Sequence, residues 1–308
     1  SSCIKKMSLL IDVVNIIFAT KSGHLTDKSK VKISLNKSYN RQILPSKQEE
    51  DIDTIWKKRL YENPTLFNGT KFRLQSAHYS EGDMTLHLNM GVTCYKDFLG
   101  TNWSPDALSL QSLGLEQHDD SQAFLSDALG VGAMLRTADD KMIILKRSDQ
   151  CGEDQGKWDR PGGHAEPKEV YGDIPMEMIE LNSSSSEAVV EELFSSIIGE
   201  VVDEVNIPAQ YLDEPKIIGL FRNTLNTGKP NMEFLVGCSL SSKEVIKRYQ
   251  EGVQKESFES TNIRAISMED VLTIQQDDPK TWESFAPGAR GVIILYKMYH
   301  HRFTLGNK

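Results

Sequence analysis

Several features that mark common protein classes are scarce in this sequence. It has only four cysteines in 308 residues, and no two of them form a C-x-x-C pair. A zinc site or a disulfide framework is therefore not expected, and we expect an intracellular, cytoplasmic protein. Positive charge is also scarce, because 35 lysines and arginines face 44 acidic residues for a net charge of −9. This balance argues against nucleic acid as a partner, and a phosphate-containing ligand would need a metal ion or locally placed cations.

A long hydrophobic run is missing as well. The longest apolar stretch, residues 7–18, contains Asp12 and is far shorter than the roughly 20 residues that cross a bilayer. We expect a strand here rather than a secretory signal, because Asp12 interrupts the apolar run and no cleavage site of small residues follows cleanly. The sequence therefore predicts no membrane association.

The length of the chain predicts about two domains, and the sequence pattern changes near residue 126. We expect an N-terminal domain over residues 1–126 and a second domain over residues 127–308. The expected elements of the first domain are a polar loop at 20–50, a helix at 51–61, strands at 71–79 and 84–93, and a helical or looped connection at 104–126.

The second domain interleaves strands with helices. Apolar residues at three- and four-residue steps predict a long helix over 187–205. Two apolar segments on either side of Asp139 and Asp140 predict a hairpin. The other expected elements are strands at 217–222, 233–240 and 263–267 and helices at 241–250 and 287–299. This order predicts an α/β sandwich with a mixed sheet, preceded by a smaller α+β N-terminal domain.

Three carboxylates gather near the end of the predicted long helix. Glu200, Asp203 and Glu204 have the i, i+3 and i+4 spacing that places them on one helix face. Like charges repel there and the helix dipole disfavours anions, so a divalent cation with oxygen ligands would relieve the site. A solvated acidic face is the competing interpretation. The upstream turn Pro161-Gly162-Gly163 favours the metal site, since glycine lets the backbone approach a ligand closely.

These features together resemble the Nudix hydrolase superfamily, whose box reads G-x5-E-x7-R-E-U-x-E-E-x-G-U, where U is a bulky aliphatic residue. Gly163 and Glu169 match the front of this box, and GEVVDEVNI, residues 199–207, matches its end. The two matches are out of step by 22 residues, which we interpret as a loop inserted between the turn and the helix. At three positions the box has Arg, Glu and Gly where this chain has Gly199, Asp203 and Asn206.

Further segments resemble one branch of that superfamily, the UDP-glucose pyrophosphatases or UDP-sugar diphosphatases. The matching segments are KFRLQSAHY (71–79), GVTCYKDFLGTNW (91–103), LGVGAMLRTADD (129–140), PGGHAEP (161–167), ELFSSIIGEVVDEVNIP (192–208), EFLVGCSL (233–240) and GVIILY (291–296). They lie in both expected domains, so the resemblance covers most of the chain beyond residue 50. Its GTNW block is more specific than the box, which serves many substrates.

The resemblance implies a Nudix α/β/α sandwich that hydrolyses the diphosphate of UDP-glucose or UDP-galactose, giving UMP and the sugar 1-phosphate. Its cofactor would be Mg²⁺, with Mn²⁺ as an alternative, held by Glu200 and Glu204 as catalytic ligands and by Asp203. The general base stays open among Glu191, Glu192, Glu200 and Glu233.

The same resemblance implies a set of substrate-binding residues. The N-terminal domain would recognise the nucleotide, with Phe67 and Tyr95 stacking on uracil, although each is as a type more often a core residue. The implied substrate-binding residues are Phe67, Tyr95, Arg147, Gly152, Asp159, His164 and Glu166.

The box itself handles a diphosphate and a metal and does not fix the rest of the substrate. A Nudix enzyme acting on ADP-ribose or on a dinucleotide is therefore one alternative. A catalytically inactive nucleotide-binding module is another, suggested by Gly199 and by the split box. Neither the preferred hexose nor the oligomeric state follows from these motifs.

Overall fold

Two β-sheets form the frame of the protein. The computed structural model describes residues 9–20 and 24–305, with Leu9 and the last four residues in backbone only. The larger sheet contains β1 (Leu9–Ile11), β2 (Val14–Ala19), β6 (Gly130–Arg136), β7 (Lys141–Arg147), β8 (Trp158–Asp159), β9 (Gly162–His164), β10 (Lys216–Asn223), β11 (Lys229–Gly237) and β12 (Ser260–Ser267). Its strand order is β1-β2-β10-β11-β6-β7-β12, with β8 beside β7 and β9 beside β6. The neighbours β6 and β11 run parallel and the other pairs antiparallel, so the predicted mixed sheet is confirmed.

Strands β6 and β7 separate soon after their turn. They form the predicted hairpin around Asp139 and Asp140, but they pair directly only at Arg136 and Met142. Farther along, β6 pairs with β9 and β7 pairs with β8. The turn between β8 and β9, which carries Pro161, is thereby held inside the split of the sheet.

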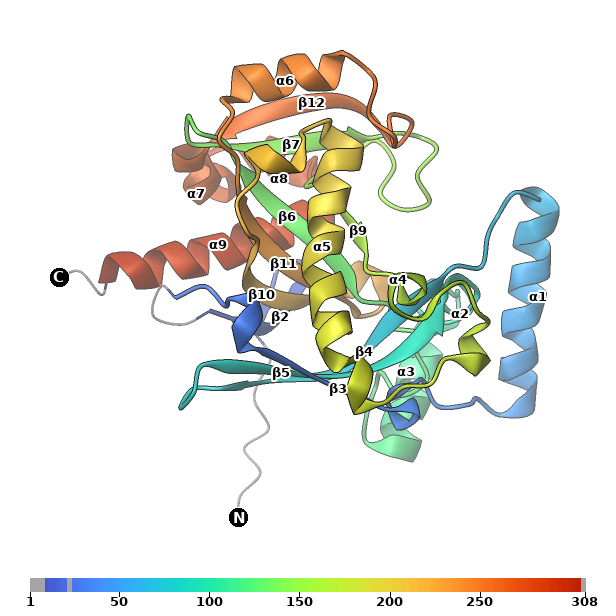
Figure 1. Ribbon diagram of the computed structural model, residues 1–308. Coiled ribbons are helices and arrows are strands. Elements are labelled where there is room, and N and C mark those ends of the chain that lie inside the picture. Colours follow the sequence, from blue (N-terminus) through green and yellow to red (C-terminus); the bar gives the residue numbers. More distant parts are fainter. Residues whose placement is uncertain (1–8, 21–23, 306–308) are drawn as a thin grey trace.

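Helices cover both faces of the large sheet (Figure 1). The helices are α1 (Ser46–Glu62), α2 (Tyr95–Gly100), α3 (Ala107–His118), α4 (Pro167–Tyr171), α5 (Ser186–Val205), α6 (Ser242–Gln250), α7 (Met268–Asp277), α8 (Pro279–Glu283) and α9 (Pro287–Leu305). On one face, α5 packs its apolar residues against alternate residues of β6, such as Val131 and Ala133. On the other face, α9 and α7 pack against Met134 and Met142. This arrangement confirms the expected α/β/α sandwich.

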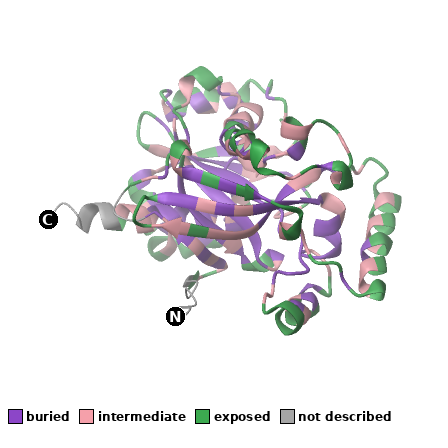
Figure 2. Cartoon of the chain, turned by 60° about the horizontal axis from the view of Figure 1, so that its bottom comes forward, coloured by how far each residue is buried: buried purple, intermediate pink, exposed green. Residues whose placement is uncertain are grey.

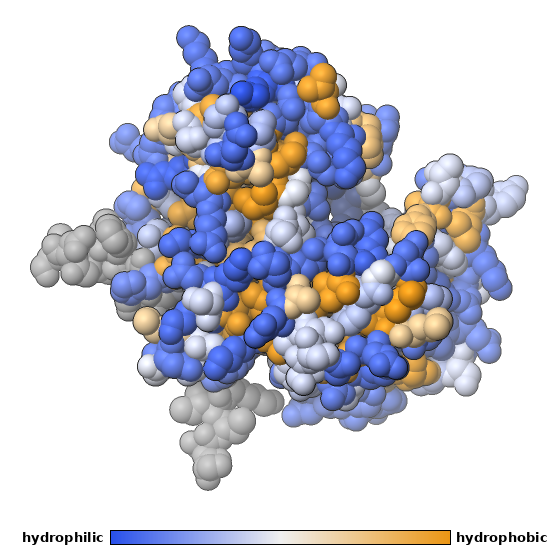
Figure 3. All heavy atoms as spheres, in the orientation of Figure 1, coloured by the Kyte–Doolittle hydropathy of each residue, from blue (hydrophilic) through white to orange (hydrophobic). Residues whose placement is uncertain are grey.

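A smaller sheet lies beside α5. It contains β3 (Val31–Leu35), β4 (Thr70–Ser80) and β5 (Thr85–Cys94) in the order β3-β5-β4. The prediction of a loop over residues 20–50 was wrong at β3, because Val31, Ile33 and Leu35 alternate with exposed residues and are buried. Figure 2 shows buried residues concentrated in the strands and exposed ones on the outer helices, including α1. The surface in Figure 3 is mostly hydrophilic, with small separate hydrophobic areas.

The first described residues belong to the large sheet. A single strand was predicted over residues 7–18, of which 7 and 8 lie outside the described residues. The chain instead forms a hairpin, because Asp12 adopts a left-handed backbone conformation at φ 57° between β1 and β2. Strand β2 then pairs with β10. None of the helices in the described part of the chain has both the length and the apolar character needed to cross a bilayer.

Candidate active site

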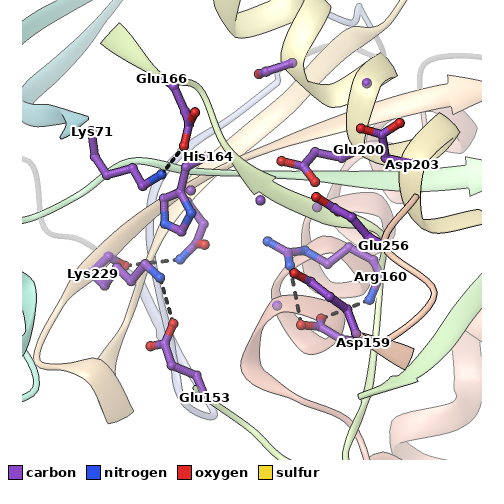
Figure 4. Close-up of a pocket in the computed structure, with 18 of the residues that line it drawn as sticks. Lys71, Glu153, Asp159, Arg160, His164, Glu166, Glu200, Asp203, Lys229 and Glu256 are labelled. Carbon is purple, nitrogen blue, oxygen red and sulfur yellow. Dashed lines mark hydrogen bonds and ion pairs between the residues drawn. The ribbon is translucent and has the colours of Figure 1, made fainter. Parts of the chain in front are cut away.

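A cavity of about 620 Å³ lies where α5, β9, the β10–β11 hairpin and the loop before β12 meet. Lys71 of β4 reaches it from the smaller sheet, so both sheets contribute to its wall. Acidic side chains gather at one side of the cavity, and Lys229 and Glu153 lie at another (Figure 4). The predicted residues Arg147, Asp159, His164, Glu166, Glu200 and Asp203 all line it.

The Pro-Gly-Gly turn meets α5 at very close range. The backbone N–H of Gly162 donates a hydrogen bond of 2.9 Å to Glu204 Oε2. A Cβ atom at Gly163 would lie 2.0 Å from Glu200 Oε1, and one at Gly162 would lie 2.3 Å from the Val131 carbonyl oxygen. Any side chain at either position would therefore displace the carboxylates or strand β6, which explains the two glycines physically.

Three carboxylates can hold a cation at the edge of this cavity: Glu200 and Glu256 line its wall, and Glu204 is buried one helical turn from Glu200 on α5. Glu200, Glu204 and Glu256 each offer an oxygen atom, and these atoms lie within 4.8 Å of one another. Burial, followed by repulsion from Glu256 and Glu259, raises the pKa of Glu200 to about 8. Burial and the charge of Glu200 raise the pKa of Glu204 well above its ordinary value. This all-oxygen donor set with uncompensated negative charge fits a hard divalent cation.

Asp203 does not join this cluster. Its carboxylate accepts a hydrogen bond of 2.8 Å from Lys255 Nζ, although it lies at the cavity wall. The backbone carbonyl of Asp203 also accepts from the N–H of Glu256 at 3.0 Å. Asp203 therefore fastens the loop that brings Glu256 to the other two carboxylates. Sequence reasoning missed Glu256, because it lies in an irregular loop 52 residues after Glu204 and no local spacing links the two.

Arg160, which directly precedes the Pro-Gly-Gly turn, belongs to a buried ion-pair network. Arg160 directs two nitrogens at the carboxylate of Glu233, with Nη2 to Oε1 at 3.0 Å and Nε to Oε2 at 3.2 Å. Asp159 lies 3.5 Å from Arg160 Nη1 and 3.6 Å from Arg147 Nη1. The side chain of Glu233, one of the candidate bases, is fully buried, and Arg160, which is 8% exposed, engages both of its carboxylate oxygens. Arg160 was not predicted from the sequence.

Cations surround His164 at the centre of the cavity, and Figure 4 shows its ring between Lys71 and Lys229. Burial, followed by the positive charges of Lys229 and Lys71, holds the pKa of His164 well below its ordinary value, so the ring is neutral. Glu166 forms ion pairs with Lys71 and Lys168. These cations can compensate the charge of a diphosphate bound across the cavity.

Three predicted substrate-binding residues, Phe67, Tyr95 and Gly152, lie outside the cavity wall. Tyr95 is half-buried, and an added Cβ at the exposed Gly152 would lie 3.5 Å from its hydroxyl group. Phe67 is 70% exposed and lines a separate cavity of about 330 Å³. Of the other candidate bases, Glu191 pairs with Lys28 at 2.8 Å on the surface, whereas Glu192 lines the active cavity and accepts from the N–H of Glu166 at 3.0 Å.

The raised pKa of Glu200 predicts a pH effect on stability in the absence of metal. Since its folded-state pKa of about 8 exceeds the unfolded value near 4.5, the folded protein holds a proton that unfolding releases. The free energy of unfolding therefore falls as the pH rises from about 4.5 to 8. In EDTA, Glu200→Gln should melt at the same temperature as the wild type at pH 5 and a few degrees higher at pH 8.5. Equal melting temperatures at both pH values would contradict this.

Comparison with known proteins finds relatives that are similar to this chain over most of their length. The chain is 39% identical over 287 residues to the uridine diphosphate glucose pyrophosphatase NUDT22 of Bos taurus, with 92% of this chain and 96% of that protein covered. It is 40% identical over 288 residues to the protein of the same name from Homo sapiens, with 92% of each chain covered. It is 34% identical over 291 residues to Nudix hydrolase 9 of Arabidopsis thaliana, with 89% of this chain and 88% of that protein covered. No family model matches the chain.

Proposed function

This chain belongs to the Nudix hydrolases, in the family of the uridine diphosphate glucose pyrophosphatases, and on that premise we propose that it hydrolyses the diphosphate of UDP-glucose or UDP-galactose. The products are UMP and the sugar 1-phosphate. The observation that carries the proposal is the cluster of Glu200, Glu204 and Glu256 in a cavity whose other walls carry lysines and arginines. Carboxylates to hold a cation and cations to hold phosphates are the two requirements of diphosphate hydrolysis.

We propose Mg²⁺ as the cofactor, with Mn²⁺ as an alternative, held by Glu200, Glu204 and Glu256. When bound, the ion supplies positive charge that neutralises the diphosphate and favours attack by water. Asp203 acts through Lys255 by keeping Glu256 in place. Glu200 is our choice for the proton acceptor, because it belongs to the carboxylate cluster while Glu192 contacts the backbone of Glu166.

Substrate binding is assigned to the remaining cavity wall. Arg147, held near Asp159, presents a planar fork to the diphosphate. Neutral His164 can donate a hydrogen bond to a phosphate oxygen, and the Glu166–Lys71 pair connects this wall to the smaller sheet. We propose that residues 1–126 recognise the nucleotide, with Phe67 and Tyr95 nearest to the base. Gly152, from the second part of the chain, lies beside Tyr95.

We also propose that the protein works in the cytoplasm. Cys94, Cys151 and Cys238 are buried free thiols, and this state fits a reducing compartment.

A substrate panel tests the proposed function and the role of Tyr95 together. With Mg²⁺, the wild type should cleave UDP-glucose with a higher kcat/KM than ADP-glucose, ADP-ribose or a dinucleotide. Tyr95→Ala should remove a stacking partner worth about 1–3 kcal/mol, which raises KM for UDP-glucose and narrows the ratio of UDP-glucose to ADP-glucose.

Two results would point elsewhere. Binding of UDP-glucose without turnover would support an inactive nucleotide-binding module. A lower melting temperature of Tyr95→Ala with an unchanged UDP-to-ADP ratio would make Tyr95 a packing residue, in keeping with its contacts to Trp56 and Phe98.

A further inference from the structure

Four residues of the β10–β11 hairpin form a buried polar surface at one end of the cavity. This hairpin wall consists of Asn223, Asn226, Lys229 and Asn231, which are 6%, 9%, 7% and 8% exposed. All four line the cavity. Buried polar side chains nearly always form hydrogen bonds. The donors and acceptors of these residues that have no partner in the protein can therefore bind a ligand in the cavity.

The turn that carries the hairpin wall is held in an unfavourable conformation. Thr227, a β-branched residue, has φ 51°, and Gly228 follows with φ 88°. A threonine in the left-handed region is strained, and such strain persists only where surrounding contacts impose it.

Asn102 of the GTNW block imposes this conformation. Its carbonyl oxygen accepts from Thr227 Oγ1 at 2.9 Å, and its Nδ2 donates to the Asn226 carbonyl oxygen at 3.3 Å. From the other side, Arg222 Nη1 donates to the Gly228 carbonyl oxygen at 2.8 Å. The turn is thereby fixed before any ligand arrives, which is the condition for a selective binding surface.

Acidic groups complete the hairpin wall. Glu153 accepts from Lys229 Nζ at 3.0 Å and also from Asn226 Nδ2, and the backbone carbonyl of Glu153 accepts from Arg147 Nε at 2.9 Å. Asp154 lines the cavity next to it. The surface therefore offers carboxylate acceptors, amide groups that both donate and accept, and one ammonium donor.

This combination of hydrogen-bonding groups suits the hexose of a nucleotide sugar better than its base. A hexose carries several hydroxyl groups, each of which can donate to a carboxylate and accept from an amide or ammonium group. Uracil has one N–H donor and two carbonyl acceptors, which neighbouring carboxylates would repel. Within the described part of the chain no phenylalanine, tyrosine or tryptophan lines this cavity, whereas a base gains much of its affinity from stacking on such rings.

We propose that the hairpin wall, completed by Glu153, is the hexose-binding subsite and determines which sugar of a nucleotide sugar is accepted. This inference rests on the proposed function for the identity of the nucleotide. Asn102 is a positioning residue in it, since it holds the turn and does not line the cavity.

Calorimetric binding in EDTA tests the subsite without requiring turnover. The ligands are UDP-glucose, UDP-xylose, which lacks the hydroxymethyl group of glucose, CDP-glucose, and UDP, which lacks the hexose. For Glu153→Gln and Asn226→Ala we expect about tenfold weaker binding of UDP-glucose, unchanged binding of UDP, and a narrower ratio of UDP-glucose to UDP-xylose. The ratio of UDP-glucose to CDP-glucose should stay the same. Asp149→Asn, an acid-to-amide change on an exposed residue of the same loop, serves as the matched control and should alter none of these values.

Three outcomes would overturn the subsite. Equal weakening of UDP and UDP-glucose would place the hairpin wall against the phosphates. A changed ratio of UDP-glucose to CDP-glucose with an unchanged sugar ratio would make it the base site. A lower melting temperature without any change in binding would make it a structural element only. Failure of the proposed function is separate, because it would show as absent hydrolysis in Mg²⁺ while these binding ratios stand.

Discussion

Replacing Glu204 with glutamine is expected to lower the turnover of UDP-glucose about 100-fold or more, the size of the loss when one strong electrostatic element is removed from an active site. The change keeps the shape of the side chain and removes the charge that would hold the cation. The amide oxygen of the new side chain can still accept from Gly162 N–H, so the Pro-Gly-Gly turn keeps its support and only the charge is lost. Glu200→Gln and Glu256→Gln should behave similarly, since all three carboxylates form one cluster.

Asp203→Asn is the matched control for this series. Asp203 lies on the same helix but pairs with Lys255, so its replacement should reduce turnover far less than the loss of a cluster carboxylate. Turnover and its dependence on Mg²⁺ concentration should be measured for all four variants. Near-normal rates and unchanged Mg²⁺ dependence in Glu200→Gln and Glu204→Gln would contradict the metal site. The carboxylates would then form only a solvated acidic surface.

Arg160→Leu is expected to reduce the free energy of unfolding by about 3–5 kcal/mol, because it leaves the fully buried carboxyl group of Glu233 without its partner. Burial already raises the pKa of Glu233 to about 7 against the opposing charge of Arg160, and loss of Arg160 would raise it further. A raised folded-state pKa means that stability is lost as the pH rises. The difference in the free energy of unfolding between the wild type and the variant should therefore be larger at pH 8 than at pH 5. Urea unfolding at both pH values measures it.

The double variant Arg160→Leu/Glu233→Leu separates the effect of the unpaired buried carboxyl group on stability from the effect of lost packing. When both partners become apolar, no buried charge is left alone, and most of the lost stability should return. A double variant as unstable as Arg160→Leu would mean that packing around Gly132 and Gly288, where an added Cβ would come within 2.2 Å and 2.7 Å of Arg160, matters more than the ion pair.

The spacing of residues along one helix was enough to predict the part of the site that this helix carries. Glu200 and Glu204 are one helical turn apart, and the helix that carries them has the expected bounds to within one residue. Asn206, which stands where the box has glycine, ends this helix in the left-handed conformation at φ 63° and ψ 40°, which asparagine tolerates. Gly199, which replaces the arginine of the box, has no atom within 4 Å of an added Cβ and lines the cavity, so its effect is to leave room there.

The long-range part of the site was beyond sequence reasoning. Glu256 and Arg160 reach the cavity only because the loop before β12 and the split between β6 and β7 converge on α5. Asp203 shares the helix with Glu200 and Glu204, but Lys255, from that distant loop, holds its carboxylate. The inserted stretch between α4 and α5 contains only short 3-10 turns, in keeping with the loop expected between the two halves of the box.

The central claim is that a divalent cation held by Glu200, Glu204 and Glu256 enables this chain to cleave the diphosphate of a UDP-sugar. The most direct test is ³¹P nuclear magnetic resonance of UDP-glucose incubated with the wild-type chain, once with Mg²⁺ and once with EDTA. We expect the two diphosphate signals to be replaced by those of UMP and glucose 1-phosphate in Mg²⁺ only, with no such change for Glu204→Gln on the same timescale. Intact UDP-glucose in Mg²⁺, release of UDP instead of UMP, or equal cleavage in EDTA would contradict the account.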